Sequence, residues 1–563
     1  MSRTAAAIWR SANRLLPQAS DYSGLERTWR GDLLAGLTVG VVALPLALGF
    51  GVASGVGATA GIVTAIVAGI VAAVFGGSSV QVSGPTGAMA VVLVPIVAHD
   101  GVSAVASVAI IAGVIVIGMG LSGLGRMIQF VPWPVLEGFT VGIAVTIALQ
   151  QVPLLLGQAK GTGSTVLDSA WRAVTGATWS AAAAALFLGA LVVVAMTVWP
   201  RVTKRVPASI VAVVVVTLVS IALHLSVPTI GALPHHLPMP SLPDLNPTVV
   251  RHLFGPAVAV AILAAIESLL SARVADAMTG TTKTSDTREM VGQGLANMAT
   301  GLFGGMPATG AIARTAVNVR AGGRSRLAAI THSLVIVTVI LVAAPVVSRI
   351  PLAVLGGVLT VTAVKMVDHR RVLSVIRAHA SEAVVFGLTA GITIAVNLVT
   401  AIEVGLVVAG VLALRAIASG SGATQEELAE HHDGPVDQSA LLSDHIAVFR
   451  LDGALFFGAA PRFLERFRSV EGVQVVILRL KGLTFIDASG AEALARIIAE
   501  LNGRGITVLV KGARPEHGRI LATAGVLAAL DAKGHLFDDL DAAVTHARQH
   551  VRSAGLIDGA GAA

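Results

Sequence analysis

Long apolar runs fill residues 33–416 and constrain the fold of this chain more than any other feature. A helix needs roughly 20 apolar residues to cross the hydrocarbon core of a bilayer. The runs of that length are residues 33–53, 57–75, 102–123, 131–151, 180–199, 206–226, 253–273, 328–348 and 380–397. Shorter or glycine-broken stretches are residues 85–98, 286–302, 308–318, 351–366 and 400–416. The pattern predicts a polytopic α-helical membrane protein with about fourteen spans.

Charge divides the chain into two solvent environments. About 22% of residues 421–563 are charged, against about 9% of residues 1–420, and soluble domains carry roughly 25%. We therefore expect a soluble domain to follow the membrane part. The predicted organisation is an N-terminal cytoplasmic segment (1–32), a transmembrane domain (33–416), a linker (417–443), a soluble domain (444–553) and a tail (554–563).

The loops indicate the orientation. Basic residues gather in alternate loops, around Arg201, Arg320 and Arg370, whereas loop 227–245 has no Lys or Arg. Cytoplasmic loops carry such an excess, so we expect a plasma (inner) membrane protein with both termini cytoplasmic and no nucleic-acid partner. The first apolar run starts only near Leu33, which argues against a cleavable signal peptide.

Metal and thiol chemistry receive no support from the sequence. The chain has no cysteine, which excludes disulfides, zinc–thiolate sites and cysteine nucleophiles. The histidines of loop 227–245 fit a solvated, proline-rich loop better than a metal site. We therefore expect no metal centre and no cofactor beyond a coupling ion.

Two interrupted segments resemble each other, one in each half of the membrane part. They read Phe75-Gly76-Gly77 with Ser83-Gly84-Pro85-Thr86-Gly87-Ala88, and Phe303-Gly304-Gly305-Met306-Pro307-Ala308-Thr309-Gly310-Ala311. Paired interruptions mark midplane binding sites in transporters. A helix that starts inside the membrane presents unpaired N–H groups and a positive dipole end, which suit a small anion. Thr86 and Thr309 would add hydroxyl donors, and Gly87 and Gly310 allow close approach.

Glu267 lies inside the apolar run 253–273. An acid at that depth is costly and indicates a functional site by default. Ser271 follows one turn later on the same face, so the pair could hold a proton or a cation. The alternative is a structural glutamate bonded to nearby backbone. Glu289, in contrast, falls beside a loop, where we expect it to be solvated or paired with Arg288.

Several of these stretches resemble the sulfate permease (SulP) family of anion transporters, and within it the cyanobacterial bicarbonate-transporter branch. The matching stretches are Ala43-Leu44-Pro45-Leu46-Ala47, Gly84-Pro85-Thr86-Gly87, Ile266-Glu267-Ser268-Leu269-Leu270, Ala275-Asp276-Ala277-Met278-Thr279-Gly280, Gly292-Gln293-Gly294 and Arg314-Thr315-Ala316-Val317-Asn318. The resemblance implies a 7+7 inverted-repeat transporter fold with core and gate domains, an elevator mechanism and a homodimer. It also implies an anion site between the third and tenth helices.

The resemblance also implies roles for single residues. Thr86, Gly310 and Ala311 match substrate-contacting positions, with Thr309 adjoining them. Glu267 and Ser271 match cation-coupling positions, although the sodium-coupled bicarbonate branch has aspartate and threonine there. The glutamate at position 267 instead resembles the residue found at this position in proton-coupled members of the family. Nucleobase symporters of similar fold usually add an acid on the tenth helix, which this chain lacks.

The charged tail alternates strands and helices, which predicts an α/β domain. Strand 475–480, followed by Phe485-Ile486-Asp487-Ala488-Ser489-Gly490, resembles a STAS (sulfate transporter and anti-sigma antagonist) domain. Ala488 replaces the serine that anti-sigma antagonists phosphorylate. Asp487 and Ser489 are weak candidates for regulation, and capping of the next helix is the simpler role.

The sequence thus predicts a secondary active transporter that moves a small anion across the lipid bilayer. The anion would be bicarbonate, sulfate or a dicarboxylate, and Glu267 would couple its transport to protons. The alternatives are a sodium-coupled bicarbonate symporter, an anion exchanger or uncoupled channel, and a membrane-anchored sensor with a STAS output. An enzyme is not expected, because no ATP-binding loop or catalytic cluster is present.

Overall fold

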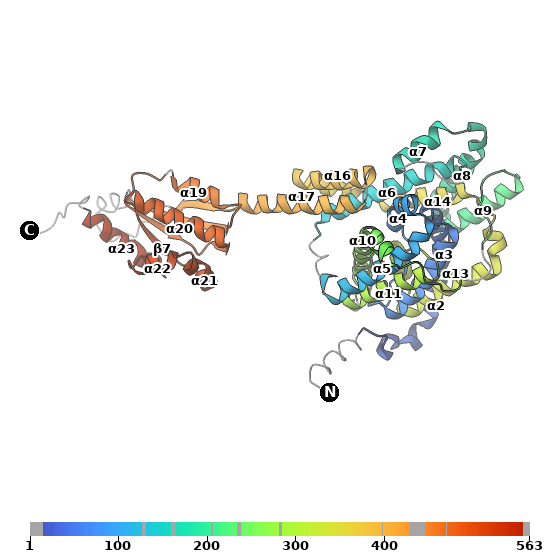
Figure 1. Ribbon diagram of the computed structural model, residues 1–563, viewed down its shortest axis with the longest axis horizontal. Helices are drawn as coiled ribbons and strands as arrows, with labels where there is room; N and C mark the ends of the chain where they lie inside the picture. Colours follow the sequence, from blue (N-terminus) through green and yellow to red (C-terminus); the bar gives the residue numbers. More distant parts are fainter. Residues whose placement is uncertain are drawn as a thin grey trace, which may run out of the picture. The chain divides into compact units, whose positions relative to one another are not determined.

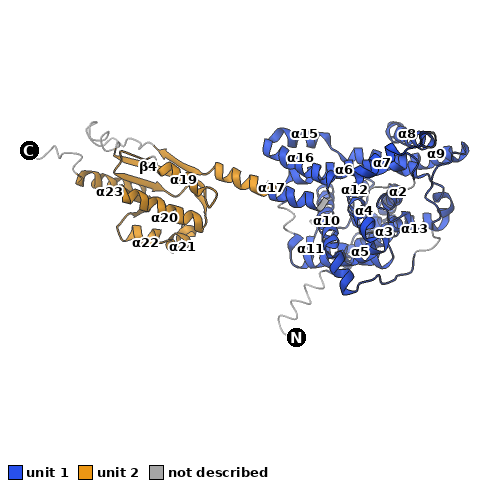
Figure 2. Cartoon of the chain, turned by 45° about the horizontal axis from the view of Figure 1, so that its top comes forward, with its two compact units in different colours: residues 1–407 blue, residues 408–563 orange. Residues whose placement is uncertain are grey.

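The computed structural model describes residues 15–125, 131–158, 165–203, 206–233, 238–280, 284–396, 398–426, 445–468 and 470–554. Its residue contacts divide the chain into two compact units, Met1–Val407 and Val408–Ala563 (Figure 2). Each unit has its own hydrophobic core, so each is described by itself.

A helix lies at each of the fourteen predicted runs (Figure 1). They are α2 (Leu25–Ala53), α3 (Ala58–Phe75), α4 (Gly87–Asp100), α5 (Val102–Leu121), α6 (Trp133–Leu155), α8 (Trp179–Val202), α9 (Ala208–Ala222), α10 (Pro247–Thr279), α11 (Asp286–Leu302), α12 (Ile312–Arg320), α13 (Arg326–Val347), α14 (Leu352–Met366), α16 (Ala380–Ala395) and α17 (Leu398–Ser419). Among the described residues, nine helices are long and apolar enough to cross a membrane. Three short helices of the first unit were not predicted: η1 (Ala19–Tyr22), α7 (Val166–Thr175) and α15 (His369–Ala378).

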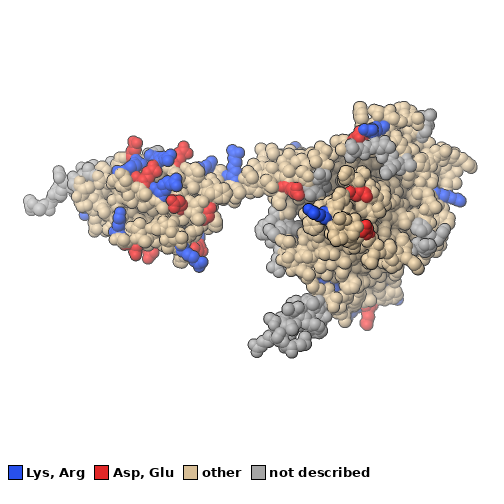
Figure 3. Space-filling model, viewed as in Figure 1, with Lys and Arg blue, Asp and Glu red and all other residues tan. Residues whose placement is uncertain are grey.

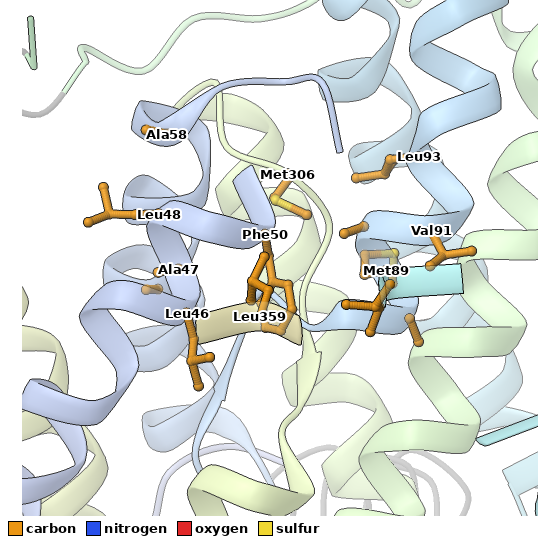
Figure 4. Packing of buried hydrophobic residues seen from close by; sticks show 14 of the residues in the cluster. Leu46, Ala47, Leu48, Phe50, Ala58, Met89, Val91, Leu93, Met306 and Leu359 are labelled. Atoms are coloured by element: carbon orange, nitrogen blue, oxygen red, sulfur yellow. The ribbon is translucent and has the colours of Figure 1, made fainter. Parts of the chain in front are cut away.

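The helices of the first unit pack in two groups. Helices α2 to α5 pack with α10 to α13, and α6, α8 and α9 pack with α14 and α16. The membrane helices thus form two packed groups. Phe50, Met89, Met306 and Leu359 belong to the main apolar cluster (Figure 4). Small residues permit close packing: a Cβ on Gly61 would lie 2.0 Å from the carbonyl oxygen of Ala47 on α2.

The outer surface of the first unit is apolar. Val342, Val346 and Val364 are 77%, 65% and 66% exposed. In the face shown by Figure 3, charged side chains are sparse on this unit and dense on the second one. Extended exposed apolar surface marks a membrane or protein interaction site, as expected for a membrane domain.

An ion pair joins η1, near the N-terminus, to α11. Nη1 and Nη2 of Arg288 donate to the two carboxylate oxygens of Asp21 on η1, at 2.9 and 2.5 Å. The Arg288 guanidinium holds the pKa of Asp21 below its usual value of 3.8. The expected partner of Arg288, Glu289, is engaged elsewhere.

The second unit is an α/β domain with a six-stranded sheet. Its strands are β3 (Gly422–Glu426), β4 (Ile446–Leu455), β5 (Val475–Arg479), β6 (Leu483–Ile486), β7 (Thr507–Lys511) and β8 (Leu536–Phe537). The order is β3-β4-β5-β7-β8, with β6 paired to β4, and β3 is antiparallel to β4 while all other pairs are parallel. Strand β3 lies within the stretch that was expected to be a linker. It was not predicted as a strand because its polar sequence shows no alternation of apolar and polar residues. Residues 427–443 of that linker lie outside the described part of the chain.

Helices cover both faces of this sheet. One face packs on α19 (Ala460–Arg468), α20 (Ala488–Gly503), α21 (Pro515–Thr523) and α22 (Val526–Asp531), and the other packs on α23 (Leu540–Ser553). Alternate residues serve the two faces, since Val476 and Leu478 face the larger cluster while Val475 and Ile477 face α23. Parallel strands buried on both faces, such as β4, β5 and β7, are expected to be continuously apolar.

Candidate functional site

Two very short strands join the predicted interruptions. Strand β1 (Ser83–Gly84) pairs antiparallel with β2 (Thr309–Gly310), so that Ser83 lies opposite Gly310 and Gly84 opposite Thr309. All four residues are buried. The β1–β2 pair therefore places the start of α4 beside the start of α12, as the internal similarity predicted.

Both helices begin with amides that have no partner within the helix. Thr86 caps α4, where its hydroxyl accepts from the Met89 N–H at 3.3 Å, and Ala311 is the N-cap of α12. The first i→i−4 bonds are made by Ala90 and Thr315. The N–H groups before them, at Gly87 and Ala88 of α4 and at Ile312 to Arg314 of α12, lack intrahelical acceptors. These two helix starts form the candidate anion site.

Glu267 on α10 connects the two starts. One carboxylate oxygen, Oε2, accepts from the hydroxyl of Thr86 at 2.8 Å and from that of Thr309 at 2.6 Å. The two hydroxyl oxygens lie 3.3 Å apart, and Glu267 is half-buried. Three residues predicted separately from the sequence thus meet at one point, with both hydroxyls directed to the carboxylate.

The glycines of this site lie in close packing with neighbouring side chains. A Cβ on Gly310 would lie 2.0 Å from the amide nitrogen of Gln81, and one on Gly87 would lie 2.3 Å from Cδ1 of Ile147. The N–H of Gly310 donates to the hydroxyl of Ser268 at 3.0 Å, and that of Ala311 donates to the carbonyl of Val82 at 2.9 Å. Gly310 and Ala311 therefore shape the site, while their own N–H groups are already bonded.

Ser271 lies one turn beyond Glu267 but has another partner. Its hydroxyl is 3.1 Å from that of Thr315 on α12, and it is fully buried. Thr315 in turn accepts from the backbone N–H of Val82 at 3.0 Å. Ser271 thus helps to join α10, α12 and the segment before β1, at a distance of one turn from the carboxylate.

Arg314 is a site residue that the sequence analysis did not single out. Its side chain is nearly fully buried, and Nη2 donates to the carbonyl oxygen of Pro85 at 2.6 Å. Its Nη1 has no hydrogen-bond partner among the described residues, and it lies 2.7 Å from where a Cβ on Gly84 would stand. A buried guanidinium in the first turn of α12 adds positive charge to the helix starts. The sequence did contain a signal for it, because Arg314 is a basic residue inside the short predicted membrane stretch 308–318.

Helix α11 holds the irregular backbone that precedes each strand. Glu289 is 2% exposed and accepts from the N–H groups of Gly77 and Ser78 at 2.8 and 3.0 Å. Asn297 binds both the N–H and the carbonyl of Ala308. The prediction that Glu289 is solvated or paired with Arg288 was wrong, because unpaired backbone inside a membrane domain needs internal partners.

A cavity of about 520 Å³ lies elsewhere in the first unit. It is lined by the C-terminal half of α4, by α6 and α16, and by the N-terminal part of α10, including Pro95, Asp100 and Pro256. Thr86, Glu267 and Thr309 are not among its lining residues. The cavity therefore runs between the two helix groups at the other end of α4 from the candidate site.

In the second unit, Asp487 caps α20. Its carboxylate accepts from the N–H of Gly490 at 2.7 Å and from that of Phe457 at 3.3 Å, while Ser489 is exposed. This geometry supports the capping role of Asp487. His235 and His236 of loop 227–245 lie outside the described residues.

Two protein-family models match this chain. Residues 29–389 match the Sulfate permease family, and residues 439–543 match the STAS domain. YvdB of Bacillus subtilis, provisionally named a sulfate transporter, is 32% identical over 523 residues, which cover 91% of this chain and 96% of YvdB. The bicarbonate transporter BicA of Synechocystis is 30% identical over 514 residues, which cover 88% of this chain and 90% of BicA.

Solved structures agree with these sequence matches. The transmembrane domain of a cyanobacterial BicA superimposes with a TM-score of 0.60 at 33% identity, over 68% of this chain and 98% of that one. Murine Slc26a9, described as an inward-facing anion transporter, gives a TM-score of 0.77 over 92% of this chain and 91% of its own, at 18% identity. The second likeness extends the shared fold to most of the chain.

Proposed function

The chain belongs to the sulfate permease family of anion transporters, and on that premise we propose that it is a secondary transporter that moves a small anion together with a proton. Family members are transporters and not enzymes, as the sequence predicted. One observation carries the coupled part of the proposal: Glu267 accepts hydrogen bonds from threonines at the starts of both interrupted helices.

The anion binds between the starts of α4 and α12. The amides of Gly87 and Ala88, together with those at the start of α12, supply N–H donors and positive dipole ends. Thr86, Gly87, Thr309, Gly310 and Ala311 form the wall, and Arg314 adds a buried cation. Because backbone amides select for charge and size, we propose a small oxyanion or carboxylate as substrate, such as bicarbonate, sulfate or a dicarboxylate.

Glu267 provides the coupling. When it is ionised, it repels an incoming anion and occupies the hydroxyl hydrogens of Thr86 and Thr309. Two unit charges about 5 Å apart repel by roughly 3 kcal/mol at an effective dielectric constant of 20. A proton on Glu267 removes this repulsion and frees the hydroxyls to donate to the anion. Because coupling is reciprocal, the bound anion also favours protonation.

The partner of Ser271 supports a proton over a sodium ion. Hard cations are held by several oxygen ligands. Ser271, the oxygen ligand expected next to Glu267, is instead bonded to Thr315. Sodium-coupled bicarbonate symport is therefore the second candidate, and its support is the likeness to BicA.

We also propose how the transporter moves, where it resides and how it assembles. Helices α2 to α5 and α10 to α13 carry the site as one body, which moves against the remaining helices in an elevator manner. The protein is placed in the plasma (inner) membrane with both termini cytoplasmic, because of the basic loops, and it functions as a homodimer. The STAS domain is assigned a regulatory role.

Uptake into proteoliposomes tests the function. Labelled bicarbonate, sulfate and a dicarboxylate are offered separately under an inward proton gradient, an inward sodium gradient or no gradient. Concentrative uptake of one anion that requires the proton gradient and collapses with a protonophore supports the proposal.

Other outcomes assign another function. Uptake driven by sodium alone identifies the symporter, and uptake that requires a trans anion identifies an exchanger. Large currents without accumulation identify a channel. Saturable binding of an anion without flux identifies a sensor.

A further inference from the structure

Three histidines of the second unit converge on one point. His535 precedes β8, and His546 and His550 lie one turn apart on the same face of α23. The ring centroids of the three pairs are 4.9 to 5.6 Å apart. One ring nitrogen from each histidine lies within 4.8 Å of the other two. A hydrogen bond between His546 and His550 accounts for two of these nitrogens, but it does not account for the third, which comes from His535 outside the helix.

The spacing of the nitrogens fits a metal ion. Zinc binds imidazole nitrogen at about 2.0–2.1 Å, so two ligands of a tetrahedral site lie about 3.3 Å apart. The Nε2 atoms of His546 and His550 are 3.2 Å apart. The third nitrogen, from His535, is within 4.8 Å, so a small side-chain rotation completes a three-nitrogen set.

Both supporting elements are rigid. The backbone carbonyl of His535 accepts from the N–H of Val510 on β7, and the backbone N–H of His535 donates to the carbonyl of Leu530. The His535 ring also has a backbone hydrogen bond with Val508, and such a bond at the second ring nitrogen orients metal-binding histidines. Ala543 and Ala547 bury the adjoining face of α23 against the sheet. The rings are half-buried, so an ion in solution can reach them.

We propose that His535, His546 and His550 form a binding site for one divalent transition-metal ion of the zinc class. Three imidazoles and a water complete a tetrahedral site, and imidazole suits zinc, copper and nickel rather than magnesium or calcium. A bound ion bridges α23 to the segment before β8, so it fastens the last helix of the STAS domain to the edge of its sheet.

Metal titration of the full chain tests the site. The tag-free protein in detergent is stripped with a chelator and titrated with Zn²⁺ in competition with a chromophoric indicator. We expect one tight equivalent per chain, and at least tenfold weaker binding in His546→Gln and in His550→Gln. Co²⁺ is expected to give the intense visible absorption of tetrahedral coordination, a readout on the unaltered protein that does not depend on any variant folding.

Matched variants exclude other histidines. His445→Gln changes a half-buried histidine beside β4, and His431→Gln with His432→Gln removes the pair that the sequence places before it. Both controls are expected to bind as the unaltered chain does. The proposal is overturned by no binding at micromolar Zn²⁺, by wild-type binding in both cluster variants, or by a loss confined to the control variants.

Discussion

The hydroxyl of Thr86 lies 2.8 Å from a carboxylate oxygen of Glu267, although 181 residues separate them in the chain. The same oxygen accepts from Thr309, so one carboxylate on α10 connects the starts of α4 and α12. A carboxylate in this position senses both helix starts that we assign to the anion. The proton state of Glu267 and the occupancy of the site are therefore expected to depend on each other.

Glu267→Gln is expected to abolish accumulation driven by a proton gradient. Glutamine keeps the size of the side chain and an oxygen acceptor for the two threonines, but it carries no proton that can be exchanged. Exchange of labelled for unlabelled anion at equal concentration is expected to continue, with little dependence on pH. Glu403→Gln, at an exposed position on α17, serves as the control. Gradient-driven uptake at the wild-type rate in Glu267→Gln would disprove the coupling role.

Thr309→Val is expected to weaken proton-coupled uptake, measured as Vmax/KM, by roughly 10- to 100-fold. The substitution removes the hydrogen bond that we propose the Thr309 hydroxyl donates to the bound anion. Hydrogen bonds to charged groups contribute about 1.5–3 kcal/mol. Thr309→Ser keeps the hydroxyl and is expected to stay within a few-fold of the wild type. Equal uptake by the valine and serine variants would show that the hydroxyl takes no part.

Gly310→Ala is expected to reduce transport severely and to lower the melting temperature in detergent. The added methyl group would lie 2.0 Å from the Gln81 amide and 3.1 Å from Cα of Ser268, and overpacking costs about 1–3 kcal/mol. Gly118→Ala on α5 has nothing within 4 Å of its new Cβ and is the matched control. The packing argument fails if both alanine variants transport and melt alike.

Asp21→Asn is expected to lower thermal stability at neutral pH. The pair with Arg288 is largely buried, with side chains 14% and 10% exposed, and loss of one partner of such a pair costs about 1–3 kcal/mol. Because Arg288 lowers the pKa of Asp21, the ion pair stabilises the fold above about pH 4 and is lost as the pH falls further.

Melting curves at pH 7 and near pH 3 check this dependence. The wild type and Asp21→Asn are expected to differ at pH 7 and to differ less near pH 3, because the ion pair is lost as the pH falls through the lowered pKa of Asp21. Glu26→Gln, an exposed change in the first turn of α2, is expected to follow the wild type throughout. A difference between the wild type and Asp21→Asn that persists unchanged into acid contradicts the ion-pair argument.

The sequence by itself determined the positions of the membrane helices, the two interruptions and the α/β tail. Hydropathy, glycine breaks and strand–helix alternation are local properties, so they are legible without the fold. Strand β3 was missed because its sequence is polar on both faces, and α7 and α15 because they are short and amphipathic. Glu267 could also be identified from local sequence, since an acid within an apolar run is recognisable without knowledge of the fold.

Only the tertiary structure decided which polar groups meet. Glu289 was predicted at the surface, yet it is buried on the backbone of Gly77 and Ser78. Arg314 reaches Pro85, and Ser271 reaches Thr315 rather than Glu267. A buried polar group needs a hydrogen-bond partner. That partner comes from whichever segment packs nearby in the folded structure, so local sequence patterns do not predict it.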